Sequence, residues 1–316
     1  MTRAVRSLSA QIEGFLIWKR SLGCKYGRGE LWLRAFHRFA EEQPAAIPLD
    51  QLIRSWLARN ANRKPISVAL ELSVLRQFCT YLQRRDPNVI VPTREWAPQS
   101  TESHFLPHVL SVGDVKKIVR LAAALERPTF RGPMYRTMLL VLYCTGIRFG
   151  EAVRLRLRDL DLRRGAFWIA ESKGRSRWVP FHRSLAGELA RYLKVRRAYA
   201  PATPDDGLFP RPDGTPVRVQ TASVTVRILL RRARLKPSSG RAGPRPYDIR
   251  HAFAVHRLER WYRTGVDVHA RLPWLSAYMG HEGILGTETY LTATPDLLQL
   301  AANRLRRRLS RRARWA

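Results

Sequence analysis

The chain carries the stretch TGIRFGE at residues 145–151, followed by YDIRHAFA at 247–254 and MGHEGILGTETY at 279–290. Each of the first two stretches holds an arginine, and the third holds a histidine and, nine residues after it, a tyrosine. A guanidinium binds phosphate oxygens through paired N–H groups at any physiological pH. A phenol can attack phosphorus once the charge around the phosphate is neutralised. The three stretches together therefore indicate chemistry at a phosphate.

The first arginine, Arg148, follows the apolar run MLLVLYCTG, which Gly146 interrupts. We expect Arg148 to begin or cap the next helix, with Glu151 one turn further on. In isolation, an Arg–Glu pair that holds a helix end would explain this motif as well. The segments downstream favour a phosphate ligand instead.

The second arginine, Arg250, lies at the start of a segment with helical apolar spacing. Two arginines on one phosphate could stabilise the extra negative charge of a pentacoordinate transition state, and oriented donors of this kind are usually the largest catalytic contribution. We expect the neighbouring His251 and Phe253 to pack in the core.

The third stretch contains His281 and Tyr290, and Tyr290 is the best nucleophile candidate in the chain. Gly280 predicts the end of one helix, and Thr287 predicts the N-cap of a new helix that carries Tyr290. His281 can donate a hydrogen bond to a phosphate oxygen, and a neutral imidazole costs less to bury than an ammonium. We expect packing roles for four other tyrosines: Tyr135, Tyr143, Tyr262 and Tyr278.

One strong β signal stands between these stretches. Residues 166–172 (AFWIAES) and 177–181 (RWVPF) have β character, and KGRS between them predicts a turn. The sequence therefore predicts a hairpin with Lys173 at its tip, in a chain that is otherwise mainly helical.

The chain divides into three parts by pattern. Residues 1–86 contain short amphipathic segments of helical spacing, which predict a small helical bundle. Residues 87–110 contain four prolines among polar residues, which predict a linker. Residues 111–316 predict a mostly helical domain with Ser111 as its first N-cap and a basic tail at its end. Beyond the hairpin we expect helices at 184–199, 219–235, 251–264, 271–279 and 287–303.

Composition points to a polyanionic partner. The chain of 316 residues carries 57 Lys and Arg against 25 Asp and Glu, a formal charge of +32. Such an excess speeds encounters with nucleic acid and supplies phosphate contacts that release counterions. Coding bias in a GC-rich genome explains part of the arginine content, but not the shortage of acidic residues. With 45% hydrophobic residues the chain is globular.

The cysteines and the N-terminus indicate an intracellular protein. Cys24, Cys79 and Cys144 are far apart and odd in number, which favours buried, reduced thiols over a metal site or a disulfide framework. The first residues lack the apolar region of a signal peptide, and the longest apolar run is shorter than the roughly 20 residues that cross a bilayer. We expect a cytoplasmic, nucleoid-associated protein with no membrane partner.

These segments resemble the catalytic segments of the tyrosine recombinase (phage-integrase-like) family. Four segments match in order and approximate spacing: TGIRFGE, the hairpin ESKGRSRWVP, YDIRHAFA, and GH with a tyrosine nine residues later. The resemblance implies a mainly α fold, with an N-terminal helical core-DNA-binding (SAM-like) domain and an α+β catalytic domain that includes a small β-hairpin sheet. The catalytic positions of the family fall at Arg148, Lys173, Arg250, His281 and Tyr290, and an acidic position that supports the first arginine falls at Glu151.

The chain departs from the family at Tyr247, where a histidine usually stands. A phenol can donate a hydrogen bond to phosphate, but it is a poor general base at neutral pH. We therefore expect an altered rate rather than inactivity. Tyr247 is formally a rival nucleophile, although it occupies a position that the family reserves for a phosphate donor.

The resemblance implies a mechanism and a set of partners. Tyr290 attacks a scissile phosphodiester, forms a 3′-phosphotyrosyl link and frees a 5′-hydroxyl, for which Lys173 is the best general acid. Because the protein–DNA link stores the bond energy, neither ATP nor metal should be needed, and no cofactor is expected. The implied partners are double-stranded DNA recombination sites clamped by the two domains, a homo-tetramer in the synaptic complex, and accessory proteins encoded by the same element.

Three matters stay open at this point. Leu297, Leu298 and Leu300 give the C-terminal segment an apolar face, which could pack on its own domain or on a neighbouring protomer. The sequence of residues 260–281 (RWYRTGVDVHARLPWLSAYMGH) is similar to that of transposon-encoded recombinases, including the Tn554-like transposases. This resemblance favours an element-borne integrase or transposase over a chromosome-dimer resolving enzyme. The alternatives are a catalytically silent DNA-binding protein of the same fold, a topoisomerase IB-like strand-passing enzyme and, more remotely, an RNA-binding protein.

Overall fold

A computed structural model describes residues 3–44, 47–59, 62–99, 108–125, 130–172, 175–200, 202–211, 213–291 and 295–312. The chain forms two compact units, 1–105 and 106–316. The division falls within the proline-rich stretch 87–110. Within the described ranges, no helix is both long enough and apolar enough to cross a membrane.

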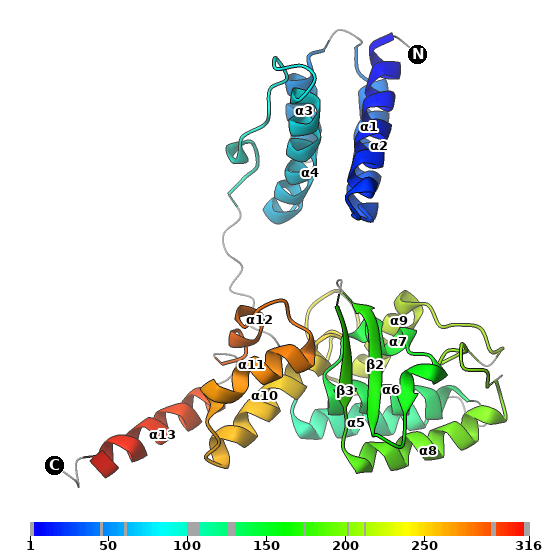
Figure 1. The fold of residues 1–316 in the computed structure, drawn as a ribbon, viewed down its shortest axis with the longest axis vertical. Coiled ribbons are helices and arrows are strands. Elements are labelled where there is room, and N and C mark those ends of the chain that lie inside the picture. Colours follow the sequence, from blue (N-terminus) through cyan, green and yellow to red (C-terminus); the bar gives the residue numbers. More distant parts are fainter. Residues whose placement is uncertain are drawn as a thin grey trace. The chain divides into compact units, whose positions relative to one another are not determined.

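The described residues of the first unit form a bundle of four α-helices (Figure 1). Its elements are α1 (Arg3–Ser21), α2 (Gly27–Glu41), α3 (Leu49–Ala58), α4 (Pro65–Gln83) and the short 3-10 helix η1 (Arg94–Trp96). Each α-helix turns one apolar face inward, so that Phe15, Phe36, Ile53 and Phe78 are fully buried together. The segment after α4 also packs here, since Ala97 is buried in the same core. The helical bundle predicted from the amphipathic spacing is therefore present.

The second unit combines helices with a small sheet. Its helices are α5 (Val112–Ala123), α6 (Arg131–Thr145), α7 (Phe149–Arg154), the 3-10 helix η2 (Leu157–Asp159), α8 (Arg183–Arg197), α9 (Val219–Arg232), α10 (Asp248–Arg263), α11 (Val268–Met279), α12 (Leu285–Glu288) and α13 (Pro295–Arg312). Its strands are β1 (Leu160–Asp161), β2 (Ala166–Ser172) and β3 (Arg175–Pro180). Ser111 caps α5 through a capping box with Asp114, as its position before that helix predicted.

The sheet is antiparallel with strand order β1-β2-β3. Phe167 pairs with Val179 on the buried face, and Trp168 pairs with Trp178 on the other face. The predicted hairpin is confirmed. The two-residue strand β1 is a third strand, which was not predicted from the sequence.

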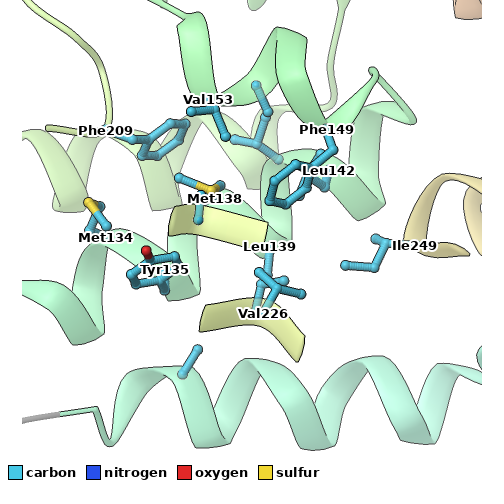
Figure 2. Packing of buried hydrophobic residues seen from close by; sticks show 14 of the residues in the cluster. Met134, Tyr135, Met138, Leu139, Leu142, Phe149, Val153, Phe209, Val226 and Ile249 are labelled. Carbon is cyan, nitrogen blue, oxygen red and sulfur yellow. The ribbon is translucent and has the colours of Figure 1, made fainter. Parts of the chain in front are cut away.

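The core of this unit surrounds α6, which is buried on nearly every side. Residues from α6, α7 and α9 and from the loop before α9 meet around Met138 and Leu139 (Figure 2). A helix that is apolar all round belongs in the middle of a domain, and the apolar run that precedes Arg148 is this helix. A second, smaller core lies under α10 and α11 and includes both Tyr290 and Leu297.

The C-terminal region corrects the predicted helix 287–303. It consists of two helices, α12 and α13, and Thr287 lies inside α12 instead of capping it. Tyr290 follows α12 in a turn, where its backbone N–H donates to Thr287 O. Pro295 is the first residue of α13, a position that proline suits because its missing N–H would have no partner within the helix there.

The cysteines were predicted to be buried, and this is correct only for Cys79. All three are free thiols, but Cys24 and Cys144 are exposed. Cys24 lies in the turn between α1 and α2, and Cys144 lies in the last turn of α6, so neither side chain faces a core.

Candidate active site

Arg148 is positioned by a turn that requires glycine. Gly146 ends α6 in the left-handed conformation, with φ 61°, and its N–H donates to Leu142 O. A Cβ at this position would lie 2.2 Å from Cδ1 of the buried Phe253. Two residues after this C-cap, Arg148 is the N-cap residue of α7.

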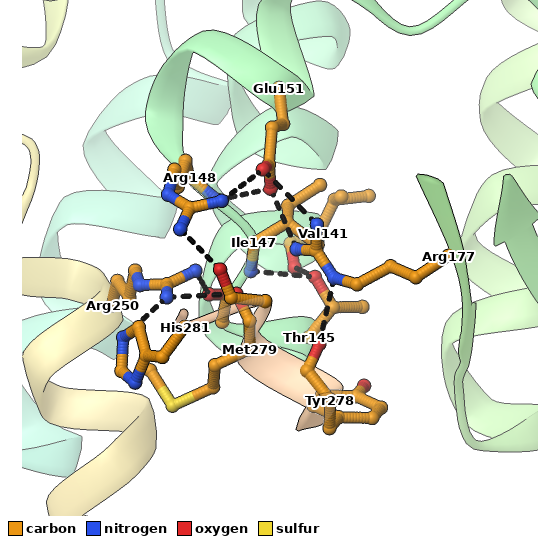
Figure 3. Close-up of polar contacts among 12 residues, drawn as sticks. Val141, Thr145, Ile147, Arg148, Glu151, Arg177, Arg250, Tyr278, Met279 and His281 are labelled. Carbon is orange, nitrogen blue, oxygen red and sulfur yellow. Dashed lines mark hydrogen bonds and ion pairs between the residues drawn. The ribbon is translucent and has the colours of Figure 1, made fainter. Parts of the chain in front are cut away.

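A single buried carboxylate, Glu151, holds two arginines. Arg148 donates to it twice, from the backbone N–H to Oε2 at 2.8 Å and from Nη1 to Oε1 at 2.8 Å. Arg177 on β3 also donates twice, from Nη2 to Oε2 at 2.9 Å and from Nη1 to Oε1 at 3.2 Å. A buried charge is tolerable only when it is paired and fully hydrogen-bonded, and Glu151 meets this condition through two different elements (Figure 3).

Arg177 is a site residue that the sequence reasoning missed. It lies on the buried face of the strand with Val179, whereas Trp178 between them is 51% exposed. Its Nε also donates to Tyr278 O at 3.0 Å, which ties β3 to the end of α11. The sequence contained one signal for this role. In a strand, Arg177 lies on the same face as Val179, and an arginine on a buried face needs a buried counter-ion.

Arg250 is fully buried in the first turn of α10 and is held by backbone carbonyls. Nη1 donates to Gly146 O at 2.7 Å, and Nη2 donates to Met279 O at 2.9 Å. Arg148 Nη2 donates in the same way to Gly280 O. Because carbonyls at helix C-termini carry partial negative charge, the ends of α6 and α11 fix both guanidinium groups side by side (Figure 3). Burial lowers the pKa of Arg250 from its ordinary value.

His281 follows α11 directly and contacts the second arginine. Gly280 ends the helix with φ 72°, as predicted for a C-cap glycine. The His281 ring then lies with Nε2 2.8 Å from Arg250 Nη2 and Nδ1 2.6 Å from Thr287 Oγ1. Both ring nitrogens therefore have a partner within the site.

Tyr290 is buried beside the two arginines, with 2% of its surface exposed. Its ring lies 5.3 Å from the His251 ring and 6.2 Å from the His281 ring, between centroids. Burial raises the pKa of the phenol above its ordinary value, while the charge of Arg250, a hydrogen bond from it and the charge of Arg148 act in the opposite direction. The arginines thus favour the phenolate in a place that otherwise disfavours charge.

Tyr247 and His251 lie next to this phenol. Tyr247 precedes α10, is 40% exposed, and packs edge-on against His251 with ring centroids 4.9 Å apart. His251 is buried, as expected for a packing residue, and burial lowers its pKa to about 4 despite Asp248 nearby. The imidazole is therefore neutral at physiological pH.

Lys173, the predicted hairpin-tip residue, lies outside the described residues. The structure brings the other predicted residues into one region: Arg148, Glu151, Arg250, His281 and Tyr290, with Tyr247 at its exposed edge. Such an array can bind an anionic oxygen centre, stabilise added negative charge on it and present a phenol to it. Among the described side chains, no group of three or more His, Cys, Asp or Glu could hold a metal ion.

Comparison with known proteins gives one family. The model of the phage integrase family matches residues 112–296. A putative integrase/recombinase of Sinorhizobium fredii, y4rB, is 32% identical, and the alignment covers 94% of this chain and 96% of the relative. The tyrosine recombinase XerD of Pseudomonas putida is 31% identical over 84% of this chain and 86% of its own.

Solved structures show the same fold. The integrase of the transposon Tn1549, in complex with a circular intermediate DNA, superposes with a TM-score of 0.66 at 17% identity, covering 93% of this chain and 99% of that one. The XerH site-specific recombinase bound to its difH substrate gives a TM-score of 0.65 at 18% identity, covering 86% and 77%. At these identities the likeness concerns the fold.

The Glu151 pairing predicts a large stability effect at Arg177. Arg177→Ala leaves a buried carboxylate with one cation instead of two, and breaking a buried pair in this way costs about 3 to 5 kcal/mol. Arg164→Ala, in the turn between β1 and β2, is the control, because Arg164 is 78% exposed and its ion pair with Asp161 contributes little. Urea unfolding of both variants measures the difference, and equal losses would contradict the role given to Arg177.

The depressed pKa of His251 predicts a loss of stability in acid. The unfolded histidine titrates near 6.5 and the folded one near about 4, so the stability that neutral His251 contributes is present above 6.5 and is lost as the pH falls toward 4. We expect His251→Gln to reduce the fall in unfolding free energy across this range by about 2 to 3 kcal/mol. Urea titrations at several pH values test this. The exposed His108→Gln is the control variant for the loss of a histidine.

Proposed function

The chain belongs to the phage integrase family of tyrosine recombinases, and from this premise we propose that it is a site-specific DNA recombinase that uses Tyr290 as its nucleophile. The observation that carries the proposal is the buried Tyr290 phenol beside Arg250 and Arg148 of the same chain. Each protomer thus holds its own nucleophile and its own phosphate-binding groups. For a DNA substrate, the place of action is the cytoplasm.

We propose the following use of the site. The phenolate oxygen of Tyr290 attacks the scissile phosphorus, a P–O bond to tyrosine forms, and the bond to the 5′-oxygen breaks. Arg148 and Arg250 neutralise the non-bridging oxygens, where rigidly held donors contribute most because they need no reorganisation during the reaction. Their anchoring to the ends of α6 and α11 supports this role.

The remaining roles follow from the residue chemistry. His281 and Tyr247 act as further hydrogen-bond donors to the phosphate. Lys173, between β2 and β3 in the sequence, supplies the proton that the departing 5′-oxygen needs. Religation reverses these steps with a 5′-hydroxyl of the partner strand. Because one phosphodiester is exchanged for another through the tyrosine link, the reaction needs neither ATP nor a cofactor.

The first unit offers a second surface for DNA. A groove of about 270 Å³ lies between α1 and α4, and Lys19, Arg76 and Arg84 line it. The Trp18 ring lies under two of these cations, 5.1 Å from Lys19 Nζ and 4.5 Å from Arg84 Cζ. Clustered cations on one face are the electrostatic mark of phosphate binding, so we place part of the DNA contact here.

The partners that we propose are two duplex sites and three further copies of this chain. A lambda integrase tetramer bound to a Holliday junction has the same fold, with a TM-score of 0.61. In this chain, Leu297 anchors α13 to its own unit, and Arg304 donates to Gly265 O and Val266 O. Leu298 and Leu305, however, are 48% and 59% exposed, and two helical turns apart they share one face. This exposed face supports a contact between protomers.

Covalent capture tests the proposed nucleophile. Purified protein is incubated with DNA fragments that flank its own gene, in EDTA and without ATP, and is then quenched with SDS. We expect a covalent protein–DNA adduct in the wild type and none with Tyr290→Phe. Tyr247→Phe, the matched control, should still form the adduct about tenfold more slowly, since it loses one hydrogen-bond donor.

Other outcomes of the capture experiment contradict the proposal in distinct ways. An adduct that survives Tyr290→Phe but not Tyr247→Phe would reassign the nucleophile. DNA binding without any adduct would indicate a catalytically silent DNA-binding protein. Relaxation of supercoiled plasmid of arbitrary sequence, without exchange between two sites, would indicate a topoisomerase-like activity.

The exposed face of α13 predicts a separable assembly defect. Leu298→Glu combined with Leu305→Glu places two carboxylates on the face that we assign to another protomer, where unpaired charge is costly. We expect wild-type affinity for one captured site and at least about a tenfold loss of two-site complexes, measured by native gel shift. A double variant that assembles normally would place the protomer contact elsewhere.

A further inference from the structure

Thr287, expected from the sequence only as a helix N-cap, is fully buried and connects the histidine with the nucleophile. Its hydroxyl lies 2.6 Å from His281 Nδ1, and its carbonyl accepts the backbone N–H of Tyr290 at 3.1 Å. We propose that Thr287 is a positioning residue that sets the tautomer of His281 and allows that tautomer to change when phosphate binds. Only the second part of this inference, the change of tautomer when phosphate binds, rests on the proposed function.

The location of the ring proton in the free protein follows from the partners of His281. A guanidinium has only donors, so His281 Nε2 must accept the hydrogen bond from Arg250 Nη2 at 2.8 Å. In a neutral ring the proton then lies on Nδ1 and is donated to Thr287 Oγ1. The free protein therefore holds the Nδ1–H tautomer, with its Nε2 lone pair turned toward Arg250.

In the Nδ1–H tautomer, Nε2 has no proton to donate to a phosphate oxygen. To donate to a phosphate oxygen, His281 needs its proton on Nε2, while Nδ1 must then accept a hydrogen bond. A hydroxyl can do both, because it accepts from Nδ1–H in one state and donates to the Nδ1 lone pair in the other. In this change the Nδ1 proton passes to water and Nε2 takes one proton from water, so the ring is neutral before and after.

The surroundings of Thr287 show why the hydroxyl decides the tautomer. The His281 ring packs so closely on Gly286 that a Cβ there would lie 3.3 Å from the ring Cγ. The ring is thus fixed in place next to Arg250, and the remaining freedom is the position of its proton. A carboxylate in place of Thr287 would only accept and would lock the Nδ1–H form, and a methyl group would leave Nδ1 without a partner.

Two variants of nearly equal shape separate positioning from packing. Thr287→Val keeps the volume and removes the hydroxyl, and Thr287→Ser keeps the hydroxyl and removes a methyl group. We expect Thr287→Val to cleave captured DNA about ten- to a hundredfold more slowly, with unchanged DNA affinity, because a buried ring nitrogen loses its partner. Thr287→Ser should stay within about threefold of the wild type, since the hydroxyl is retained. A Val variant as fast as the wild type, or a Ser variant as slow as Val, would overturn the proposal.

The tautomer itself can be read by nitrogen NMR of the full chain labelled with ¹⁵N-histidine, with His281→Gln to assign the signal. We expect the Nδ1–H form in the free protein and the Nε2–H form when Tyr290→Phe binds the captured duplex. An Nε2–H signal in the free protein, or no change on binding, would contradict the inference. If the wild type captures no DNA, the proposed function fails, but the inference about Thr287 can still be tested. Inorganic phosphate then replaces the duplex in the same NMR measurement. A change from Nδ1–H to Nε2–H supports the inference, and no change contradicts it.

Discussion

The carboxylate of Glu151 is the contact on which the arrangement of the site depends. It joins the turn after α6, through Arg148, to the sheet, through Arg177, and both links are made in a buried place where neither charge could exist alone. Arg177 continues the connection to Tyr278 O at the end of α11. A single acidic side chain thus fixes the relative positions of three segments that lie far apart in the sequence.

The second constraint is that backbone carbonyls at the ends of α6 and α11 accept hydrogen bonds from the two arginines. Gly146 and Gly280 both end their helices in the left-handed conformation, and this turns carbonyls of α6 and α11 toward the guanidinium groups. The two arginines are therefore held before any ligand arrives, at the cost of burying cations. The burial of Tyr290 among them keeps the reactive phenol away from water in the free protein.

Much of this could be predicted from the sequence, because the local signals were strong. The glycine C-caps, the hairpin and the apolar helix α6 each depend on short-range chemistry that a few residues determine. Arg177 and Thr287 escaped prediction because their roles depend on partners far away in the sequence or across a turn: a carboxylate 26 positions away, and an imidazole six positions away. The predicted helix through Tyr290 was wrong because apolar spacing alone does not fix where a helix ends: α12 stops at Glu288, and α13 begins only at Pro295.

The register of β3 carries a consequence for how this protein can diverge. Arg177 faces Glu151 because side chains alternate along the strand, with Trp178 on the other side. If one residue were deleted between the hairpin turn and Arg177, the alternation of side chains along β3 would shift by one. The indole of Trp178 would then face Glu151, and Arg177 would face solvent. The opposite strand, β2, contains a one-residue irregularity between Ile169 and Ser172, whereas β3 must keep its phase if Arg177 is to stay opposite Glu151.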